Sequence, residues 1–395
     1  MATIALENSN RKSSLLQIIP VMFCFFAMGF VDLVGTACNS VKEDLNLSNT
    51  ATSFIPSLVF FWFLIFSVPT GMLMNKIGRK KTVLVSLVVT LLSLIVPLFG
   101  NGYALMLVAF SLLGIGNAIM QTSLNPLVSN LIAPDKLAST LTFGQFVKAI
   151  ASLLATVIIP WGAANVAMTF GLSWRFVFAI YAIVCLISIT VLAATPIREE
   201  KPDKATGIIE CLKLLGRPFI ILCFLGIVCH VGIDVGANST AQRILSEKVN
   251  MGINDAAVAV SIYFTCRMIG CFLGGFLLRI MSPKVFFGIS VLIMLASMVL
   301  LFCSSTLIVL YVAFGMVGFG NSNIFSVVFA QALNHAPTEQ NEVSGLMIMG
   351  LFGGFIFPLC MGFAADIFSS QNAAIAVMTV GVAYLLYYTL KIKKA

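Results

Sequence analysis

The stretch FFAMGFVDLVGTACNS, residues 25–40, places a carboxylate inside an apolar run that is long enough to cross a lipid bilayer. A charged side chain at the bilayer centre is disfavoured by about 2.5–3.5 kcal/mol on insertion scales, so acids in membrane helices usually face a bundle interior or a water-filled cavity. Asp32, Thr36 and Asn39 recur at the spacing of one helical face. The pattern predicts a polar face that lines a pathway, with Asp32 as its ionisable group.

The rest of the chain is also strongly apolar. Of its 395 residues, 59% are hydrophobic and 10% are charged, and the mean hydropathy is +1.04. These values leave too few polar residues to cover a soluble globule of this size. Apolar segments of about 18–25 residues, separated by short polar links, predict an all-α membrane protein with twelve transmembrane helices. We expect the helices at residues 16–38, 51–74, 82–99, 103–131, 140–161, 173–194, 218–241, 255–280, 285–304, 306–332, 343–365 and 372–390.

The positions of Lys and Arg predict how these helices are oriented. With both termini inside, most of the 23 Lys and Arg residues fall in cytoplasmic segments. Cytoplasmic loops carry an excess of these residues, so we expect an integral protein of a bacterial inner membrane with cytoplasmic N- and C-termini. The formal charge of +8 follows from this topology, and we expect no nucleic-acid partner. The basic residues on the opposite side are Lys42, Arg175, Arg243 and Lys248.

The two halves of the sequence resemble each other. GFVDLVGTACNS at 29–40 is echoed by HVGIDVGANST at 230–240, and LLGIGN at 112–117 by MVGFGN at 316–321. Asp32 precedes Asp234 by 202 residues, and Gly116 precedes Gly320 by 204 residues. Short matches at a nearly constant offset indicate a duplicated unit. We therefore expect one six-helix bundle over residues 1–194, a cytoplasmic linker over 195–217 and a second six-helix bundle over 218–395.

Two helices of the first half carry further polar groups. Asn117, Gln121 and Asn125 share one face of the expected fourth helix, and Gln145 lies one turn before Lys148 in the fifth. Amide side chains both donate and accept hydrogen bonds, which suits the hydroxyls of a sugar. Lys148 lies too deep for its ammonium group to reach the interface easily, so it needs an acid or a solvated cavity.

The second half repeats this arrangement. His230, Asp234 and Asn238 recur at helical spacing in the expected seventh helix, Arg267 lies near the middle of the eighth, and Asn321 lies in the tenth. Each half therefore has one acid and one strong base within its helices. Two interpretations stay open: static ion pairs that only neutralise buried charge, or an acid that alternates between protonated and ionised forms.

Four segments resemble the fucose:proton symporter family, which includes glucose/galactose transporters, within the major facilitator superfamily. They are NTATSFIPSLVFFWFLIFSVPTGMLMNKIGRKK at 49–81, QTSLNPLVSN at 121–130, LTFGQFVKAI at 141–150 and YFTCRMIGCFLGGFLLRIMSPK at 263–284. The resemblance implies the major facilitator fold of two pseudo-symmetric six-helix bundles, and sugar transport. The sequence departs from the family at Gln121, where an acid is expected, at Asn75, where the loop signature usually has an acid, and at Lys148.

We therefore expect a secondary active transporter that moves a sugar into the cell with protons by alternating access. The expected partners are the sugar, protons and the lipid bilayer; no cofactor is expected, and the protein is expected to be a monomer. The proton-coupling candidates are Asp32 and Asp234. The substrate-binding candidates are Asn39, Gln121, Asn125, Gln145, Lys148, His230, Asn238, Arg267 and Asn321.

Other functions remain as alternatives. Lys148 or Arg267 would suit the carboxylate of an acidic sugar such as a sialic or uronic acid. A proton-coupled exporter of drugs or other solutes is a second alternative, although the glycine-proline signature usual in such antiporters is absent from GQFVKAIASLLATVIIP at 144–160. A membrane enzyme is disfavoured, because the sequence has no zinc motif, nucleophile elbow or phosphate loop. A non-transporting sensor on a transporter scaffold is also disfavoured.

Overall fold

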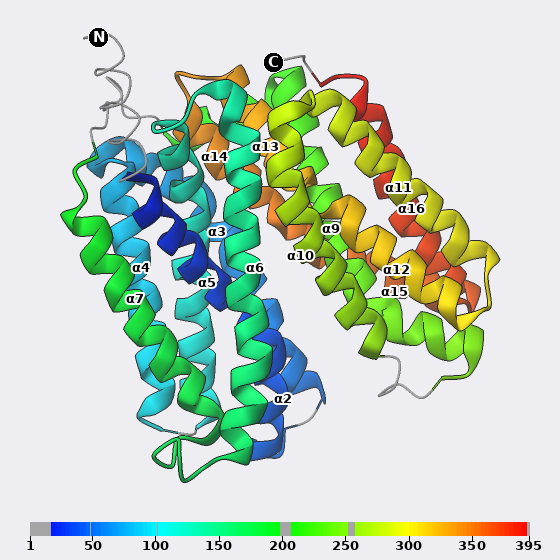
Figure 1. Cartoon of the computed structure of the whole chain (residues 1–395), viewed down its shortest axis with the longest axis horizontal. Helices are drawn as coiled ribbons and strands as arrows, with labels where there is room; N and C mark the ends of the chain where they lie inside the picture. The colour runs from blue at the N-terminus through cyan, green and yellow to red at the C-terminus, as the bar shows by residue number, and fades with distance from the viewer. Residues whose placement is uncertain (1–16, 48, 101, 198–206, 252–256, 393–395) are drawn as a thin grey trace. The chain divides into compact units, whose positions relative to one another are not determined.

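The computed structural model describes residues 17–47, 49–100, 102–197, 207–251 and 257–392. Its regular elements within these ranges are helices (Figure 1). After an apolar helix at Gln17–Asp32, which ends in the 3-10 turn η1 (Gly29–Asp32), they are α2 (Leu33–Leu45), α3 (Asn49–Ile77), α4 (Arg79–Ile95), α5 (Tyr103–Ser129), α6 (Pro134–Ala164), α7 (Phe176–Ala194), α8 (Ile208–Lys213), α9 (Pro218–Val249), α10 (Ala257–Ile280), α11 (Pro283–Cys303), α12 (Leu307–Asn321), α13 (Ile324–His335), α14 (Gln340–Met349), α15 (Gly353–Phe368) and α16 (Gln371–Thr389).

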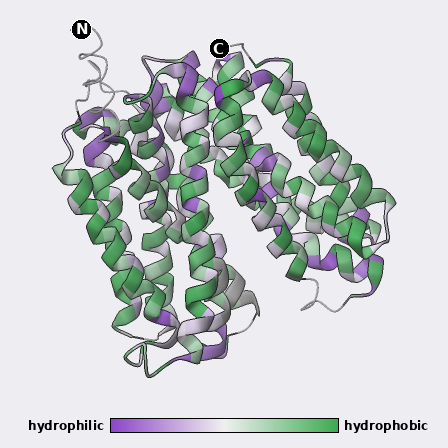
Figure 2. Ribbon diagram, in the orientation of Figure 1, coloured by the Kyte–Doolittle hydropathy of each residue, from purple (hydrophilic) through white to green (hydrophobic). Residues whose placement is uncertain are grey.

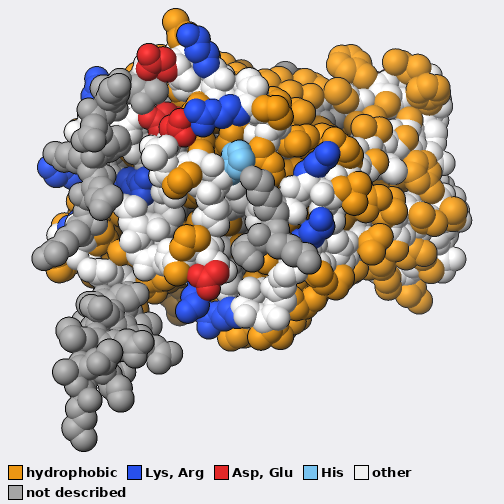
Figure 3. All heavy atoms as spheres, turned by 90° about the horizontal axis from the view of Figure 1, so that it is seen from above, with side chains coloured by type: hydrophobic (Ala, Val, Ile, Leu, Met, Phe, Trp, Pro, Cys, Tyr) orange, Lys and Arg blue, Asp and Glu red, His pale blue; other side chains and the backbone are white. Residues whose placement is uncertain are grey.

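The helices confirm the predicted membrane fold class. Within the described residues, eleven helical spans are long and apolar enough to cross a membrane, with α12 and α13 forming one span (Leu307–His335) and α14 and α15 another (Gln340–Phe368); the helix Gln17–Asp32 is a shorter apolar one. Hydrophobic residues run along the helices, and hydrophilic residues are concentrated near their ends (Figure 2). The face uppermost in Figure 1, seen from above in Figure 3, carries Lys and Arg side chains. Lipid-facing apolar surface with charged helix ends is the pattern expected of a membrane-spanning protein.

The first predicted helix, 16–38, differs from expectation. The chain changes from α to 3-10 geometry at Gly29–Asp32 and then continues as α2 to Leu45, so the link between the expected helices 16–38 and 51–74 starts only at Asn46, which has positive φ. A Cβ atom at Gly29 would collide with the backbone oxygen of Lys148, so glycine allows α6 to approach this turn closely. The polar residues of 42–44 read as a loop, but they form the last turn of a helix.

The predicted tenth helix, 306–332, is divided in the structure. It consists of α12 and α13 with a turn at Ser322 and Asn323 between them. The Asn323 amide lies against Gly274, and its Nδ2 atom donates to the oxygen of Gly270 at 2.9 Å. Backbone groups that leave the helical pattern within a membrane need internal partners, and the Ser322 carbonyl of this turn has one, because Cys271 Sγ donates to it at 3.3 Å.

The described contacts divide the chain into two compact units. Unit 1 contains Met1–Ala133, Val147–Cys211 and Thr338–Ile348, and unit 2 contains Pro134–Phe146, Leu212–Pro337 and Met349–Ala395. Each unit thus includes a short segment from the other half of the sequence, and the two segments are equivalent under the offset of about 203 residues. The predicted boundaries at 194 and 218 stay a prediction.

Equivalent packing supports the duplication. Thr90 O accepts a hydrogen bond from Ser93 Oγ at 2.6 Å in α4, and Met294 O accepts one from Ser297 Oγ at 2.6 Å in α11. Each pair lies beside a glycine of the repeated motif: a Cβ atom on Gly116 would lie 2.5 Å from Thr90 Oγ1, and one on Gly320 would lie 2.7 Å from Met294 Cγ. The same close approach of two helices therefore occurs in both halves.

The segment Thr338–Ile348 is bound to unit 1 by a polar network. Asn75 Nδ2 donates to Glu342 Oε1 at 2.5 Å, Asn341 Nδ2 donates to Asn75 Oδ1 at 2.6 Å, and Arg79 Nε donates to Asn341 Oδ1 at 2.7 Å. The carboxylate missing at Asn75 is thus supplied by Glu342, 267 residues further along the chain. In the same unit, burial, and to a smaller degree the charge of Glu342, raises the pKa of the Cys211 thiol to about 12.

Pro126 provides a further attachment point for this segment. Proline has no N–H, so it leaves the carbonyl four residues earlier without its helical donor. That carbonyl, Thr122 O, accepts a hydrogen bond from Ser344 Oγ at 2.5 Å. The carbonyl that Pro126 leaves without a helical donor is therefore one of the points at which this segment is attached.

Candidate functional site

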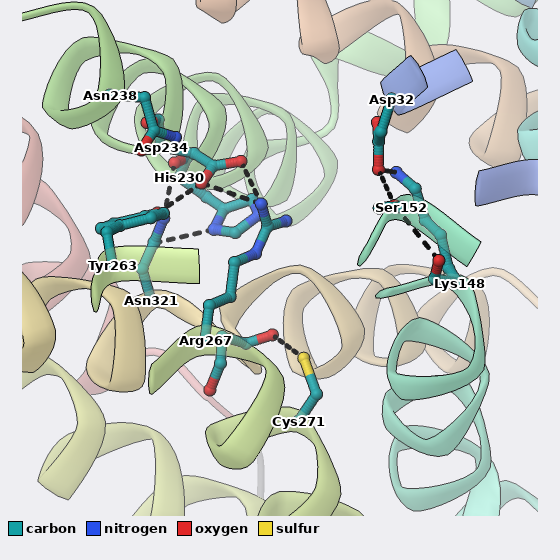
Figure 4. Close-up of polar contacts among 11 residues, drawn as sticks. Asp32, Lys148, Ser152, His230, Asp234, Asn238, Tyr263, Arg267, Cys271 and Asn321 are labelled. Atoms are coloured by element: carbon teal, nitrogen blue, oxygen red, sulfur yellow. Dashed lines mark hydrogen bonds and ion pairs between the residues drawn. The ribbon is translucent and has the colours of Figure 1, made fainter. Parts of the chain in front are cut away.

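Asp32 is the last residue of η1 and is held by α6 of unit 1. Ser152 Oγ donates to Asp32 Oδ2 at 2.6 Å, and Lys148 Nζ lies 3.6 Å from the same oxygen (Figure 4). The Asp32 side chain is 42% exposed and that of Lys148 15%. This predicted ion pair is therefore present but long, and the carboxylate keeps contact with solvent-accessible space.

The polar face of α5 forms a ladder of amides. Asn117 Nδ2 donates to Met28 O at 2.7 Å, Gln121 Nε2 donates to Asn117 Oδ1 at 2.7 Å, and Asn125 Nδ2 donates to Gln121 O at 2.8 Å. All three side chains are buried. The structure thus brings the predicted face together, with its members bonded to one another.

Asp234 in unit 2 is held much more firmly than Asp32. Arg267 Nη1 lies 2.7 Å from Asp234 Oδ2 and 2.9 Å from Oδ1, and the hydroxyl of Tyr263 donates to Oδ1 (Figure 4). The Asp234 side chain is 14% exposed. Charge-assisted hydrogen bonds from two α10 residues stabilise the ionised carboxylate.

His230 is buried one turn before Asp234 and is joined to Asn321 of α12. Asn321 Nδ2 donates to His230 O at 3.1 Å, and Asn321 Oδ1 lies 2.8 Å from His230 Nδ1. Since a backbone oxygen only accepts, the amide orientation is fixed and Asn321 Oδ1 must accept from Nδ1–H. The neutral imidazole therefore carries its proton on Nδ1, which leaves Nε2 as the acceptor nitrogen.

Two predicted substrate residues have oxygen atoms without hydrogen-bond partners. Asn125 Oδ1 and Asn238 Oδ1 are both buried, and neither has a partner among the described residues. Asn238 Nδ2 donates to Asp234 O at 2.9 Å, so its oxygen is the atom left over. A buried polar atom without a partner costs about 1–3 kcal/mol, and a bound hydroxyl would remove that cost.

The remaining predicted residues are placed as follows. Gln145 lies on α6 in the portion that belongs to unit 2, whereas Lys148 lies in the portion that belongs to unit 1. Asn39 belongs to α2, and its side chain is outside the described part of the structure. Sequence reasoning missed Ser152 and Tyr263 as partners of the acids. The available signal was that each lies one helical turn from the base of its pair.

Comparisons with known proteins agree with this architecture. The family model described as Major Facilitator Superfamily matches residues 21–347 and 225–394. A glucose/galactose transporter of Brucella abortus is 25% identical over 405 residues, which cover 97% of this chain and 96% of the relative.

Solved structures show the same fold. A crystal structure of the E. coli fucose:proton symporter has a TM-score of 0.81 at 18% identity and covers 96% of this chain and 100% of its own. A structure of the proton:xylose symporter XylE bound to 6-bromo-6-deoxy-D-glucose has a TM-score of 0.76 at 16% identity and covers 98% and 97%, respectively.

Proposed function

Because the chain belongs to the Major Facilitator Superfamily, we propose that it is a secondary transporter that carries a neutral monosaccharide into the cell together with protons by alternating access. The observation that carries the proposal is that Asp32 is bound by fewer contacts and by a longer ion pair than Asp234. Asp32 has one short hydrogen bond and one long ion pair, whereas Asp234 is bound by Arg267 and Tyr263. Asp32 is thus the proton carrier, and Asp234 is a fixed partner of Arg267.

A neutral substrate follows from the charges within the helices. Lys148 and Arg267 each face an acid of their own unit, so neither requires a substrate carboxylate for neutralisation. The unpartnered oxygens of Asn125 and Asn238 need donors, which sugar hydroxyls supply. The Brucella abortus relative, a glucose/galactose transporter, supports the same substrate class.

The proposal also includes the oligomeric state, the membrane and the orientation of the protein. The protein works as a monomer in a bacterial inner membrane, with its termini in the cytoplasm and without a cofactor or an enzymatic reaction. The matched proteins are transporters, which supports this setting.

Uptake into liposomes tests the function directly. The purified full chain is reconstituted, an inward proton gradient is applied, and labelled D-glucose, D-galactose, L-fucose and N-acetylneuraminate are compared. We expect accumulation of at least one neutral sugar that a protonophore abolishes. Accumulation of N-acetylneuraminate alone would favour the acidic-sugar alternative. Efflux of a drug by a protein that transports none of these sugars would favour an exporter.

The amide faces predict a loss of sugar affinity on truncation. Gln121→Ala and Asn238→Ala should each weaken binding about 5- to 150-fold, because a lost hydrogen bond to a bound hydroxyl costs about 1–3 kcal/mol. Binding is measured by the ligand-induced rise in melting temperature. Asn165→Ala, at the end of α6, is the control and should bind as the wild type does. Wild-type affinity in both test variants would place the sugar on other helix faces.

Substitution of Lys148 tests whether the substrate is a neutral or an acidic sugar. If Lys148 is the ion-pair partner of Asp32, the variant Lys148→Gln should bind a neutral sugar within a few fold of the wild-type affinity. Its transport should lose the dependence on the proton gradient. The reason is that this substitution removes the cation that lies 3.6 Å from the carboxylate of the proposed proton carrier, Asp32. Affinity is measured against pH for Lys148→Gln, Asp32→Asn and the double variant. Strict additivity of the two substitutions would show that the residues are not a functional pair.

A further inference from the structure

We propose that Asn117 is a positioning residue that links sugar occupancy on α5 to the protonation of Asp32. The sugar part of this inference rests on the proposed function, whereas the step from Asn117 to Asp32 rests on the structure of unit 1 alone. Asn117 does not carry the proton and makes no hydrogen bond to Asp32. It acts through the 3-10 turn that ends at Asp32.

The Asn117 amide is fixed at both ends. It is 3% exposed, its Nδ2 donates to Met28 O at 2.7 Å, and its Oδ1 accepts from Gln121 Nε2 at 2.7 Å. Because the Met28 oxygen only accepts, the amide cannot be reversed without losing both hydrogen bonds. Any change at Gln121 therefore reaches Met28 through one rigid group.

The Met28 carbonyl lies where the helix changes pitch. In an α-helix it would accept from the N–H of Asp32, four residues on, but Gly29–Asp32 forms a 3-10 turn. Asn117 holds this carbonyl at the start of the turn, and Asp32 is its last residue. On the other side, Gly29 packs against the backbone of Lys148 without room for a Cβ atom. The place of Asp32 is thus set by α5 at one end and by α6 at the other.

A third helix also contacts the turn. The ring of Phe30 stacks on Tyr181 of α7 with 4.1 Å between ring centroids, and the Tyr181 hydroxyl donates to Ala151 O at 2.5 Å. The titratable groups that the described structure brings to Asp32 are therefore Lys148 of α6 and Tyr181 of α7. The α5 groups at this turn are the neutral amides of Asn117 and Gln121.

The second half contains the same amide in a different setting. Asn321 Nδ2 donates to His230 O, four residues before Asp234, as Asn117 donates to Met28 O, four residues before Asp32. However, α9 continues as an α-helix through Asp234, and Arg267 and Tyr263 fix the carboxylate directly. Only in the first half can a change at the amide alter the turn that carries the acid.

These contacts give a coupling sequence. A sugar hydroxyl that accepts from the second N–H of Gln121 Nε2 pulls this side-chain amide toward the sugar and lengthens its hydrogen bond to Asn117 Oδ1. The freed Asn117 amide then binds Met28 O less rigidly, the turn can relax toward α geometry, and Asp32 moves relative to Ser152 and Lys148 (Figure 4). The proton affinity of Asp32 changes because its hydrogen bond and its nearby cation change.

The test follows Asp32 itself by infrared difference spectroscopy of the purified full chain over a pH series. The band of the protonated carboxyl is assigned to Asp32 by its loss in Asp32→Asn. Without sugar, Asn117→Leu should shift the midpoint of this band by about half a pH unit, the order of one hydrogen bond. Asn117→Gln should restore part of the shift, and the matched variant Asn321→Leu should leave the Asp32 midpoint unchanged. Asn117→Ser, whose hydroxyl is too short to reach Met28 O, should reproduce the shift if the leucine variant does not fold.

The same titration with added sugar distinguishes a failure of this inference from a failure of the proposed function. D-galactose should shift the Asp32 midpoint in the wild type and not in Asn117→Leu. If Asn117→Leu and Asn117→Ser both titrate like the wild type without sugar, the positioning role is overturned. If the wild-type midpoint responds to none of the sugars tested, the symport proposal fails, and the sugar-free shifts still decide the role of Asn117.

Discussion

Asp32→Asn is expected to abolish the accumulation of sugar driven by a pH gradient while leaving the exchange of labelled for unlabelled sugar intact. One pH unit is worth about 1.4 kcal/mol per proton, or about tenfold accumulation, which the wild type should approach. An amide cannot carry the proton, so the variant should bring internal sugar only to the external concentration. The measurement is gradient-driven uptake and counterflow in the same liposomes.

Asp44→Asn is the matched control for this result. Asp44 accepts hydrogen bonds from Trp174 Nε1 at 2.8 Å and Arg175 Nη2 at 3.0 Å at the far end of α2, so its loss should leave accumulation unchanged. Normal accumulation by Asp32→Asn would remove Asp32 from the coupling step and return attention to Asp234.

Arg267→Gln is expected to destabilise the protein more than any other substitution within the ionisable pairs. Removing one partner of a largely buried ion pair costs about 3–5 kcal/mol, because the remaining charge is left without compensation. Arg267 is 25% exposed, so we expect the lower end of this range. Lys148→Gln should cost about 1 kcal/mol or less, because Asp32 is far more exposed than Asp234. The measurement is the melting temperature of the purified chain without ligand.

The double variant Arg267→Gln with Asp234→Asn tests the cause. It removes both charges, so it should recover most of the melting temperature lost in Arg267→Gln. If the double variant is as unstable as the single one, Arg267 stabilises unit 2 through packing and not through the charge of Asp234.

Much of the fold and the two ion pairs could be predicted from sequence. Long apolar runs determine where helices can cross a bilayer, and one acid and one base within the helices of each half leave few possible pairings. The nearly constant offset between the repeated motifs, 202 residues from Asp32 to Asp234 and 204 from Gly116 to Gly320, predicts the duplication. The equivalent hydrogen bonds of Asn117 and Asn321 support it.

Other features could not be predicted because they depend on tertiary contacts. The 3-10 turn at Gly29–Asp32 depends on the close approach of α6, which leaves no periodic pattern in the sequence. The carboxylate that the loop signature usually has at position 75 is supplied by Glu342, which is distant in sequence. The difference in exposure between Asp32 and Asp234 is likewise a property of packing, so the sequence could not show which of the two carboxylates is more accessible to solvent.

The exchanged segments Pro134–Phe146 and Thr338–Ile348 make the two halves depend on each other for their architecture. Ser139 Oγ donates to Gly275 O at 2.6 Å in unit 2, and Ser344 Oγ donates to Thr122 O at 2.5 Å in unit 1. Each half of the sequence therefore supplies a segment that completes the unit formed mainly by the other half, so neither half alone contains all the residues of one compact unit.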